Sequence, residues 1–308
     1  MKIYIRGTFV PLGDVKITVF NSSANTITYQ NNLIEFCEAS GEVESGKITA
    51  IKEQDITDDE FAYVMDTEDI LPRNEQFESY QANQYRAVRT ILSYVQVFDG
   101  VFELDSDLQM RSKYEWSEDR STWLPIPDKR VTTWRGADLR QTLAETFLAE
   151  IEQLVNDGIP VFLAFNHLYK AYDETNPRFK WINGTIAAEH AFKEFLSLFD
   201  RRAESLMLNI PSPPIEKLYK TVLEAYTGQA SSMYKQLQRG ATKRNELVHR
   251  PASPTPDLKE TNIYLHQVEV AIFELYTLLY PKNVFLGHAL KAAQYRLNHV
   301  IEGGTHFQ

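Results

Sequence analysis

Cysteine is almost missing from this chain of 308 residues, which contains only Cys37. A single thiol cannot form an internal disulfide, and a thiolate cluster for a structural metal cannot be assembled without a second cysteine. Cys37 lies in a strand-like stretch, which favours a buried, inert thiol over a catalytic nucleophile. We therefore expect neither a disulfide-stabilised fold nor a cysteine-ligated metal site.

Long apolar runs and nucleotide-binding motifs are also missing. No stretch approaches the ~20 apolar residues of a membrane-spanning helix, and Met1 to Arg6 lack the features of a signal peptide. The patterns G-x-x-x-x-G-K-[ST], G-x-G-x-x-G and G-x-S-x-G do not occur, so ATP hydrolysis, dinucleotide binding and serine-hydrolase chemistry lack their usual devices. We expect a cytoplasmic protein with no membrane partner, no cofactor and no metal.

Positive charge is scarce in the first part of the chain. Residues 1–180 contain 18 Lys and Arg against 30 Asp and Glu, a net charge of -12, whereas residues 181–308 contain 14 against 12, a net charge of +2. The second part also holds six of the seven histidines. Because an acidic surface repels a polyanion, we expect the first part to sense a trigger, bind a regulatory protein or cover a cleft, and the second part to bind any nucleic acid.

The hydrophobic pattern changes along the chain and predicts an α+β protein. β-branched and aromatic runs between turn signals predict antiparallel strands at 2–10, 15–20, 26–30, 47–51, 100–104 and 108–116. Residues 86–98 fit either a strand or a short helix. From Asp138 onward, apolar residues recur every three or four positions, as in helices. The expected organisation is an acidic, mainly β domain over residues 1–135, followed by an all-helical bundle over residues 136–308.

Helix signals in the second part are stronger than the strand signals in the first. Apolar periodicity predicts helices at about 138–156, 160–172, 177–206, 215–226, 231–248, 257–281 and 286–300. Asp257, with Glu260 three residues later, is a typical start of a helix. The proline-rich stretch 251–256 before it predicts a stiff connector.

Two further groups of residues have both a structural and a functional interpretation. The aromatic loop that contains Trp116, Trp123 and Trp134 could form a contact surface, although packing at the edge of the domain explains it equally well. Glu189-His190, Glu194 and Glu224 bring carboxylates and an imidazole to the helices, but a metal site needs more ligands than this pattern supplies. Surface pairs on a helix are the favoured interpretation.

The stretch Arg244-Asn245-Glu246-Leu247-Val248-His249 carries the strongest chemical signal. Histidine exchanges protons near neutral pH with a ribose 2′-hydroxyl or a leaving oxygen, and the arginine fork matches phosphate oxygens. Residues five apart on a helix are ~140° apart around its axis. Because Pro251 disfavours a helical Arg250, we expect His249 to turn at the helix end toward Arg244.

Both a catalytic and a structural interpretation fit this stretch on its own. An arginine and a histidine near the end of a helix also stabilise its last carbonyls, and Asn245 is an ordinary capping residue. On spacing alone, the structural interpretation is favoured. Lys243 and Arg250 flank the motif and are candidates for extending a phosphate site, or simply solvated charges at a helix end.

The order of the motif and its neighbouring helices resembles the HEPN superfamily. Members of this family carry, in a helical bundle, an arginine, usually a polar residue after it, and a histidine after a spacer of four to six residues, followed by a loop and the last helix of the bundle. The segment from Arg244 to His249, the connector 251–256 and the helix expected from Asp257 follow the same order. Asn176 to Phe195 resembles the family's first long helix, and the resemblance covers about residues 160–281.

The resemblance implies a bundle that forms a homodimer, with two motif copies in one cleft. It implies a metal-independent endoribonuclease that cleaves RNA by 2′-OH attack, of the kind found in toxin–antitoxin and phage-defence systems. By position, His249 is the acid–base residue, Arg244 holds the phosphate and Asn245 orients one or both. Pro251 stands where one subset of the family has a tyrosine, so regulation by adenylylation is not expected. The alternative is a non-catalytic nucleotide-binding or dimerisation module in a larger assembly.

Overall fold

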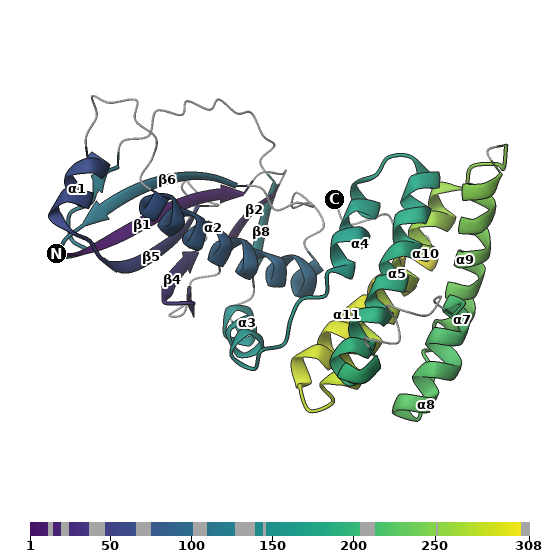
Figure 1. Ribbon diagram of the computed structural model, residues 1–308. Helices are drawn as coiled ribbons and strands as arrows, with labels where there is room; N and C mark the ends of the chain where they lie inside the picture. The colour runs from purple at the N-terminus through teal and green to yellow at the C-terminus, as the bar shows by residue number, and fades with distance from the viewer. Residues whose placement is uncertain are drawn as a thin grey trace. The chain divides into compact units, whose positions relative to one another are not determined.

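The computed structural model describes residues 1–11, 15–19, 25–36, 47–65, 75–100, 110–126, 139–143, 146–203, 213–250 and 252–302 (Figure 1). These residues form two compact units, Met1–Pro160 and Val161–Gln308, which we treat separately. Cys37, Trp134, Pro251 and the strand expected over 100–104, apart from Gly100, lie outside the described residues. The expected α+β fold class is confirmed, with an antiparallel sheet before a helical bundle.

The first unit is built on a six-stranded antiparallel sheet. Its strands are β1 (Lys2–Pro11), β3 (Thr26–Tyr29), β4 (Asn32–Phe36), β5 (Ile48–Asp55), β6 (Met110–Ser117) and β7 (Leu124–Pro125), in the order β3-β4-β5-β1-β6-β7. Buried side chains alternate along the central strand β1, which places Ile3, Ile5 and Phe9 in the core. This alternation is typical of a sheet with one face packed on a core.

Two strands of the sheet, β4 and β7, are not among the predicted strands, although the stretch around Cys37, next to β4, is strand-like in sequence. The hairpin that contains β4 shows why its turn was missed. Strand β4 pairs with β3 through a two-residue turn, Gln30-Asn31, in which both residues have positive φ angles of 49° and 60°. Turns of this kind usually contain Asn-Gly or Asp-Gly, because glycine adopts a positive φ without strain. Gln30-Asn31 lacks that glycine, and so the hairpin carries no typical sequence signal.

A long helix covers the sheet of the first unit, where the sequence left residues 86–98 open between a strand and a short helix. Figure 1 shows α2 (Glu75–Val95), continued by the π-helical turn η1 (Gln96–Gly100), lying across β1, β4 and β5. Gln84 is buried, and its Nε2 donates hydrogen bonds to the carbonyls of Ile5 (2.8 Å) and Ala50 (3.0 Å). Packing against the sheet therefore favours a helix here, although several β-branched residues lower the helix propensity of this segment.

The first unit extends further along the chain than the expected boundary at residue 135. Leu139–Leu143 forms strand β8, not the start of a helix, and pairs in parallel with β2 (Val15–Val19). Helix α3 (Phe147–Asn156) follows and contacts β3, while Thr28 donates a backbone hydrogen bond to Glu152. The unit also contains helix α1 (Asp58–Met65). The helical periodicity at Leu139 and Leu143 was misleading, because β2 lies more than a hundred residues earlier in the chain.

The second unit is a bundle of helices that matches the expected helical segments closely. Its elements are α4 (Ala164–Asp173), α5 (Pro177–Phe199), α7 (Ile215–Lys217), η2 (Leu218–Val222), α8 (Leu223–Thr227), α9 (Tyr234–His249), α10 (Leu258–Leu279) and α11 (Val284–Ile301). Helix α5 contacts α4, α9 and α10, and α10 also contacts α11. Asp257 accepts a hydrogen bond from the Glu260 amide at 3.1 Å and begins α10 as expected.

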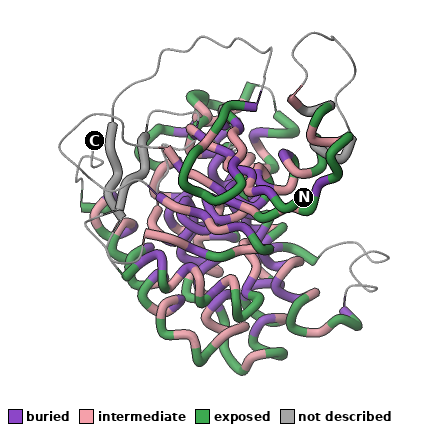
Figure 2. The backbone as a smooth tube through the Cα atoms, turned by 90° about the vertical axis from the view of Figure 1, so that its left-hand side faces the viewer, coloured by how far each residue is buried: buried purple, intermediate pink, exposed green. Residues whose placement is uncertain are grey.

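The interior of the bundle is rich in aromatic side chains. In Figure 2, buried positions lie mainly inside the trace and exposed positions mainly on its outer turns. The largest fully buried side chains of the bundle are Tyr169, Tyr219, Tyr276, Phe165, Phe192, Phe195 and Phe273. No helix among the described residues is long and apolar enough to cross a membrane.

Candidate functional site

Helix α9, which carries the Arg244 motif, is fixed to its neighbours by buried contacts. Near its middle, the Gly240 carbonyl accepts a hydrogen bond from Trp181 Nε1 at 3.0 Å, and the Trp181 ring stacks on Tyr264 with centroids 4.4 Å apart. Just before its first turn, Ser231 Oγ donates to the Glu274 carboxylate of α10 at 2.5 Å. These bonds hold the helix and its side chains in one position relative to α5 and α10.

The C-terminal end of α9 is capped from another helix. The Arg178 guanidinium, at the start of α5, donates to the carbonyls of Leu247 and Arg250, the latter at 3.2 Å. The last carbonyls of a helix lack partners within it and carry partial negative charge, so a cation stabilises them. Arg178 therefore stabilises the last carbonyls of α9, which is the role that the structural interpretation gave to Arg244 and His249.

Arg244 and Asn245 lie together on the side of α9 that faces α5 and α7. Arg244 is half-buried and Asn245 is exposed, and Arg244 Nη1 donates to Asn245 Oδ1 at 3.2 Å. The Arg244 Nε is buried and makes no hydrogen bond among the described residues. Asn245 thus accepts one hydrogen bond from the guanidinium, and the arginine charge is not paired with a described carboxylate.

His249 does not turn toward Arg244 as expected. The helix runs through His249, and the chain leaves it only at Arg250, whose backbone is extended (φ -124°, ψ 90°). Helical spacing then keeps the two side chains ~140° apart around the axis. Pro251 affects Arg250 in the way the sequence predicted, but one residue too late to redirect His249, which is exposed at the helix end.

The two residues that flank the motif are not among the residues that line the pocket of Arg244, which is described below. Lys243 is half-buried and Arg250 is exposed. The carbonyl of Arg250 accepts the hydrogen bond from Arg178. Arg250 thus takes part in the helix cap through its backbone, while its side chain is free to reach solvent.

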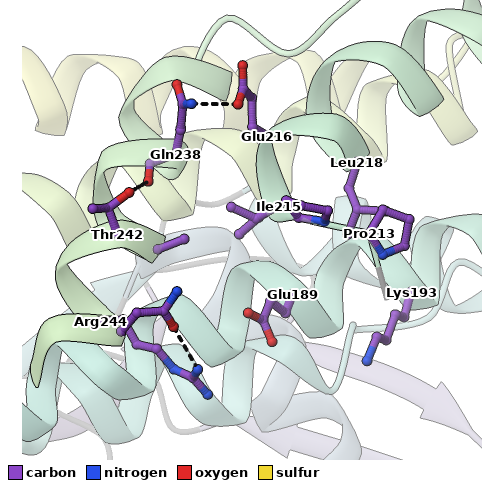
Figure 3. A pocket seen from close by; sticks show the side chains of 12 residues that line it. Glu189, Lys193, Pro213, Ile215, Glu216, Leu218, Gln238, Thr242 and Arg244 are labelled. Atoms are coloured by element: carbon purple, nitrogen blue, oxygen red, sulfur yellow. Dashed lines mark hydrogen bonds between the residues drawn. The ribbon is translucent and has the colours of Figure 1, made fainter. Parts of the chain in front are cut away.

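A pocket of about 400 Å³ lies between α5, α7 and α9 and contains Arg244 and Asn245 but not His249 (Figure 3). Helix α5 contributes Glu189 and Lys193, and α9 contributes the motif pair. The remaining lining residues are Pro213, Pro214, Ile215, Glu216, Leu218, Gln238, Ala241 and Thr242. The structure thus places a cationic motif residue beside a concave site of a size typical for small ligands.

Lys193, Gln238 and Thr242 were not identified from the sequence, and Glu189 only as one helix carboxylate among several. They reach the pocket from two helices that are distant in sequence, so no local spacing reveals them. Glu194 and His190 are not among the residues that line the pocket. Glu194 accepts hydrogen bonds from the Leu163 and Ala164 amides at the start of α4, and the ring centroid of His190 lies 4.7 Å from that of His167.

The aromatic loop of the first unit packs locally where it is described. Trp116 lies in β6 and meets Phe61 edge-on, with ring centroids 4.5 Å apart. The Arg6 guanidinium lies over the Trp123 ring at 4.2 Å. Among the described residues there is no group of three or more His, Cys, Asp and Glu side chains that could hold a metal ion.

In comparisons with protein-family models, curated proteins and solved structures, nothing matches this chain. The resemblance to the HEPN superfamily therefore rests on the sequence motif and on the order of the helices around it alone. Any functional conclusion must come from the site itself.

Proposed function

We propose that the protein is a cytoplasmic, metal-independent endoribonuclease of the toxin or phage-defence kind, regulated by its acidic N-terminal unit. The observation that carries the proposal is the Arg244–Asn245 pair, which lies at a pocket, while the same helix ends in an exposed His249. Together they offer a permanent cation for a phosphate and an imidazole that solvent and substrate can reach.

In the proposed reaction, His249 takes the proton of the ribose 2′-hydroxyl as the 2′-oxygen attacks the adjacent phosphorus. The 5′-oxygen of the next nucleotide then leaves with a proton donated by the His249 imidazolium. The product ends in a 2′,3′-cyclic phosphate. Arg244 stabilises the extra negative charge on the phosphorane oxygens, and Asn245 keeps the guanidinium oriented.

The geometry of a single chain requires a second copy for this reaction. Arg244 and His249 point to different sides of α9, so we infer that His249 of one chain acts with Arg244 of another across a two-fold dimer. Two copies of α9 then form two equivalent sites.

Purified protein should cleave RNA in the presence of EDTA and leave 2′,3′-cyclic phosphate ends. His249→Ala should lower the cleavage rate by about 10²–10⁴-fold, because a positioned acid–base group contributes that factor. The matched control is His288→Ala, an exposed histidine on α11, which should cleave like the unmodified protein. Cleavage that persists unchanged in His249→Ala refutes the assignment.

A second function, nucleotide binding without catalysis, is favoured by one observation: the pocket contains Arg244 and excludes His249. In that case a nucleotide should bind with the same affinity to the unmodified protein and to His249→Ala. RNA should then stay intact at every protein concentration. Arg244→Ala should weaken the binding, since it removes a phosphate contact.

A further inference from the structure

The pocket between α5, α7 and α9 contains charged side chains that have few hydrogen-bond partners in the part of the chain that the structure describes. Glu189 and Lys193 are half-buried, and among the described residues neither side chain forms a hydrogen bond or an ion pair, with each other or with Arg244. The Arg244 guanidinium donates to Asn245, and its Nε meets no acceptor among the same residues. Partly buried charges without partners are unfavourable, so a ligand that pairs them gains affinity.

The two acids of the pocket differ in their surroundings. Glu216 accepts a hydrogen bond from Gln238 Nε2 at 2.5 Å, whereas the Glu189 carboxylate has no hydrogen-bond partner among the described residues and keeps both oxygens for donors from a ligand. In Figure 3, Glu189 lies between Arg244 on one side and Lys193 on the other, along the wall formed by α5 and α9. A ligand in this place meets one acceptor group flanked by two cations.

The opposite wall is apolar. Ile215 and Leu218 are buried, 4% and 5% exposed, and Pro213 also lines the pocket. Figure 3 shows these side chains across the pocket from Glu189. Such a wall fits the face of a flat ring, while the charged wall contacts its polar edge.

We propose that this pocket is a guanine-nucleotide subsite, in which Glu189 reads the base and Lys193 and Arg244 hold the phosphate. A carboxylate only accepts hydrogen bonds, and guanine presents two neighbouring N–H donors, at N1 and N2, on one edge. Uracil presents one such donor, and adenine and cytosine present an amino group beside a ring acceptor, which repels a carboxylate oxygen. The two cations match the phosphate of the same nucleotide.

This inference rests on the proposed ribonuclease function for its substrate, a guanine in single-stranded RNA next to the scissile phosphate. Bases that are splayed out of single strands can be bound on their hydrogen-bonding edge in this way. Arg244 is the shared residue, since it belongs both to the pocket and to the motif that contains His249. The subsite therefore predicts that cleavage occurs next to guanosine.

The test measures binding of GMP, AMP, CMP and UMP to the full-length protein by isothermal titration calorimetry. GMP should bind more tightly than the other three by about tenfold or more, the discrimination expected of a bidentate contact. Equal affinities for the four nucleotides, or no binding at millimolar concentration, overturn the proposal. This comparison uses the unmodified protein and does not depend on how any variant folds.

Two variants separate the base contact from the phosphate contact. Glu189→Gln should lose the preference for GMP and keep its affinity for AMP, whereas Lys193→Ala should weaken all four nucleotides by a similar factor. The matched controls are Glu224→Gln and Lys291→Ala, exposed residues on α8 and α11 that do not line the pocket. A Glu189→Gln protein that unfolds at the usual temperature and still prefers GMP contradicts the assignment.

Cleavage of short RNAs with a single guanosine distinguishes the two proposals. If GMP binding depends on Glu189 but RNA stays intact, the subsite stands and the ribonuclease proposal falls. If RNA is cut in a His249-dependent manner at all four bases alike, the ribonuclease stands and the subsite falls. If the unmodified protein cuts beside guanosine and the Glu189→Gln variant cuts at all four bases, both the ribonuclease proposal and the subsite are supported.

Discussion

Charged residues in the bundle occupy two contrasting surroundings. Glu189 and Lys193 line a pocket and have no described side-chain partner, whereas Glu269, only 1% exposed, is surrounded by partners. Its carboxylate contacts Arg296 Nη2 at 2.6 Å and His266 Nδ1 at 3.0 Å. A buried charge persists only when it is paired in this way, so the cluster on α10 and α11 stabilises the fold.

Glu269 makes the stability of the protein depend on pH. Burial alone raises the pKa of this carboxyl, but the Arg296 charge and the hydrogen bonds from His266 and Arg296 outweigh it, and the pKa falls below its usual 4.5. The folded pKa is therefore lower than the unfolded one. The stabilisation is complete above pH ~4.5 and is lost as the pH falls through the folded pKa.

Glu269→Gln should lower the free energy of unfolding at pH 7 by about 3 kcal/mol, the lower end of the cost of breaking a buried ion pair, because Arg296 is partly exposed. Urea unfolding at several pH values checks this. Below pH ~4.5 the difference between the two proteins should shrink, because Glu269 itself becomes neutral. Glu224→Gln, an exposed change, should show no difference at any pH. A difference in the free energy of unfolding between Glu269→Gln and the unmodified protein that stays constant down to pH 2 contradicts this account.

Among the elements, helix α9 can pack in the bundle only because position 240 is a glycine, which has no side chain. Gly240 lies where α9 meets α5 and α10, and a Cβ at this position collides with the Tyr264 ring. That ring cannot move freely, because it stacks on Trp181 and its hydroxyl hydrogen-bonds to Thr185 Oγ1 at 3.0 Å. The glycine allows the close approach that fixes the motif-bearing helix in the bundle.

Gly240→Ala should destabilise the protein by about 1–3 kcal/mol, although alanine is the better helix former, because overpacking outweighs propensity. Gly287→Ala on α11 is the matched control, since a Cβ there meets nothing within 4 Å. It should raise the free energy of unfolding by about 0.5–1 kcal/mol. Thermal unfolding followed by circular dichroism compares the two; equal shifts for both variants contradict the packing argument.

The elements that the sequence predicted well are those with local signals. Helix α10 begins at Asp257 because its side chain caps the Glu260 amide, and both residues lie within one turn. Strand β8 and the pocket depend on segments far apart in the chain. Leu139–Leu143 pairs with β2, and Glu189 and Arg244 line one pocket from two different helices, so neither arrangement leaves a periodic trace in the sequence.

For the whole molecule, the negative charge is concentrated in the first part of the chain. The motif and the pocket lie in the second unit, where the sequence is weakly basic. Because an acidic surface repels a polyanion, the proposed RNA substrate is expected to bind the second unit. The sequence could predict this division and the motif, but not that His249 stays in the helix. Its position relative to Arg244 is decided by where α9 ends.

If the active site combines Arg244 of one chain with His249 of another, two inactive proteins should restore activity when mixed. In a dimer of Arg244→Ala and His249→Ala chains, one site carries both substitutions and the other carries none. After the chains are unfolded together and refolded, half of the dimers are mixed, and cleavage should return to about a quarter of the unmodified level. A site within one chain gives no recovery, because every chain lacks one of the two groups. The double variant Arg244→Ala/His249→Ala mixed with either single variant is the control, and it should stay inactive, since no site then holds both intact residues.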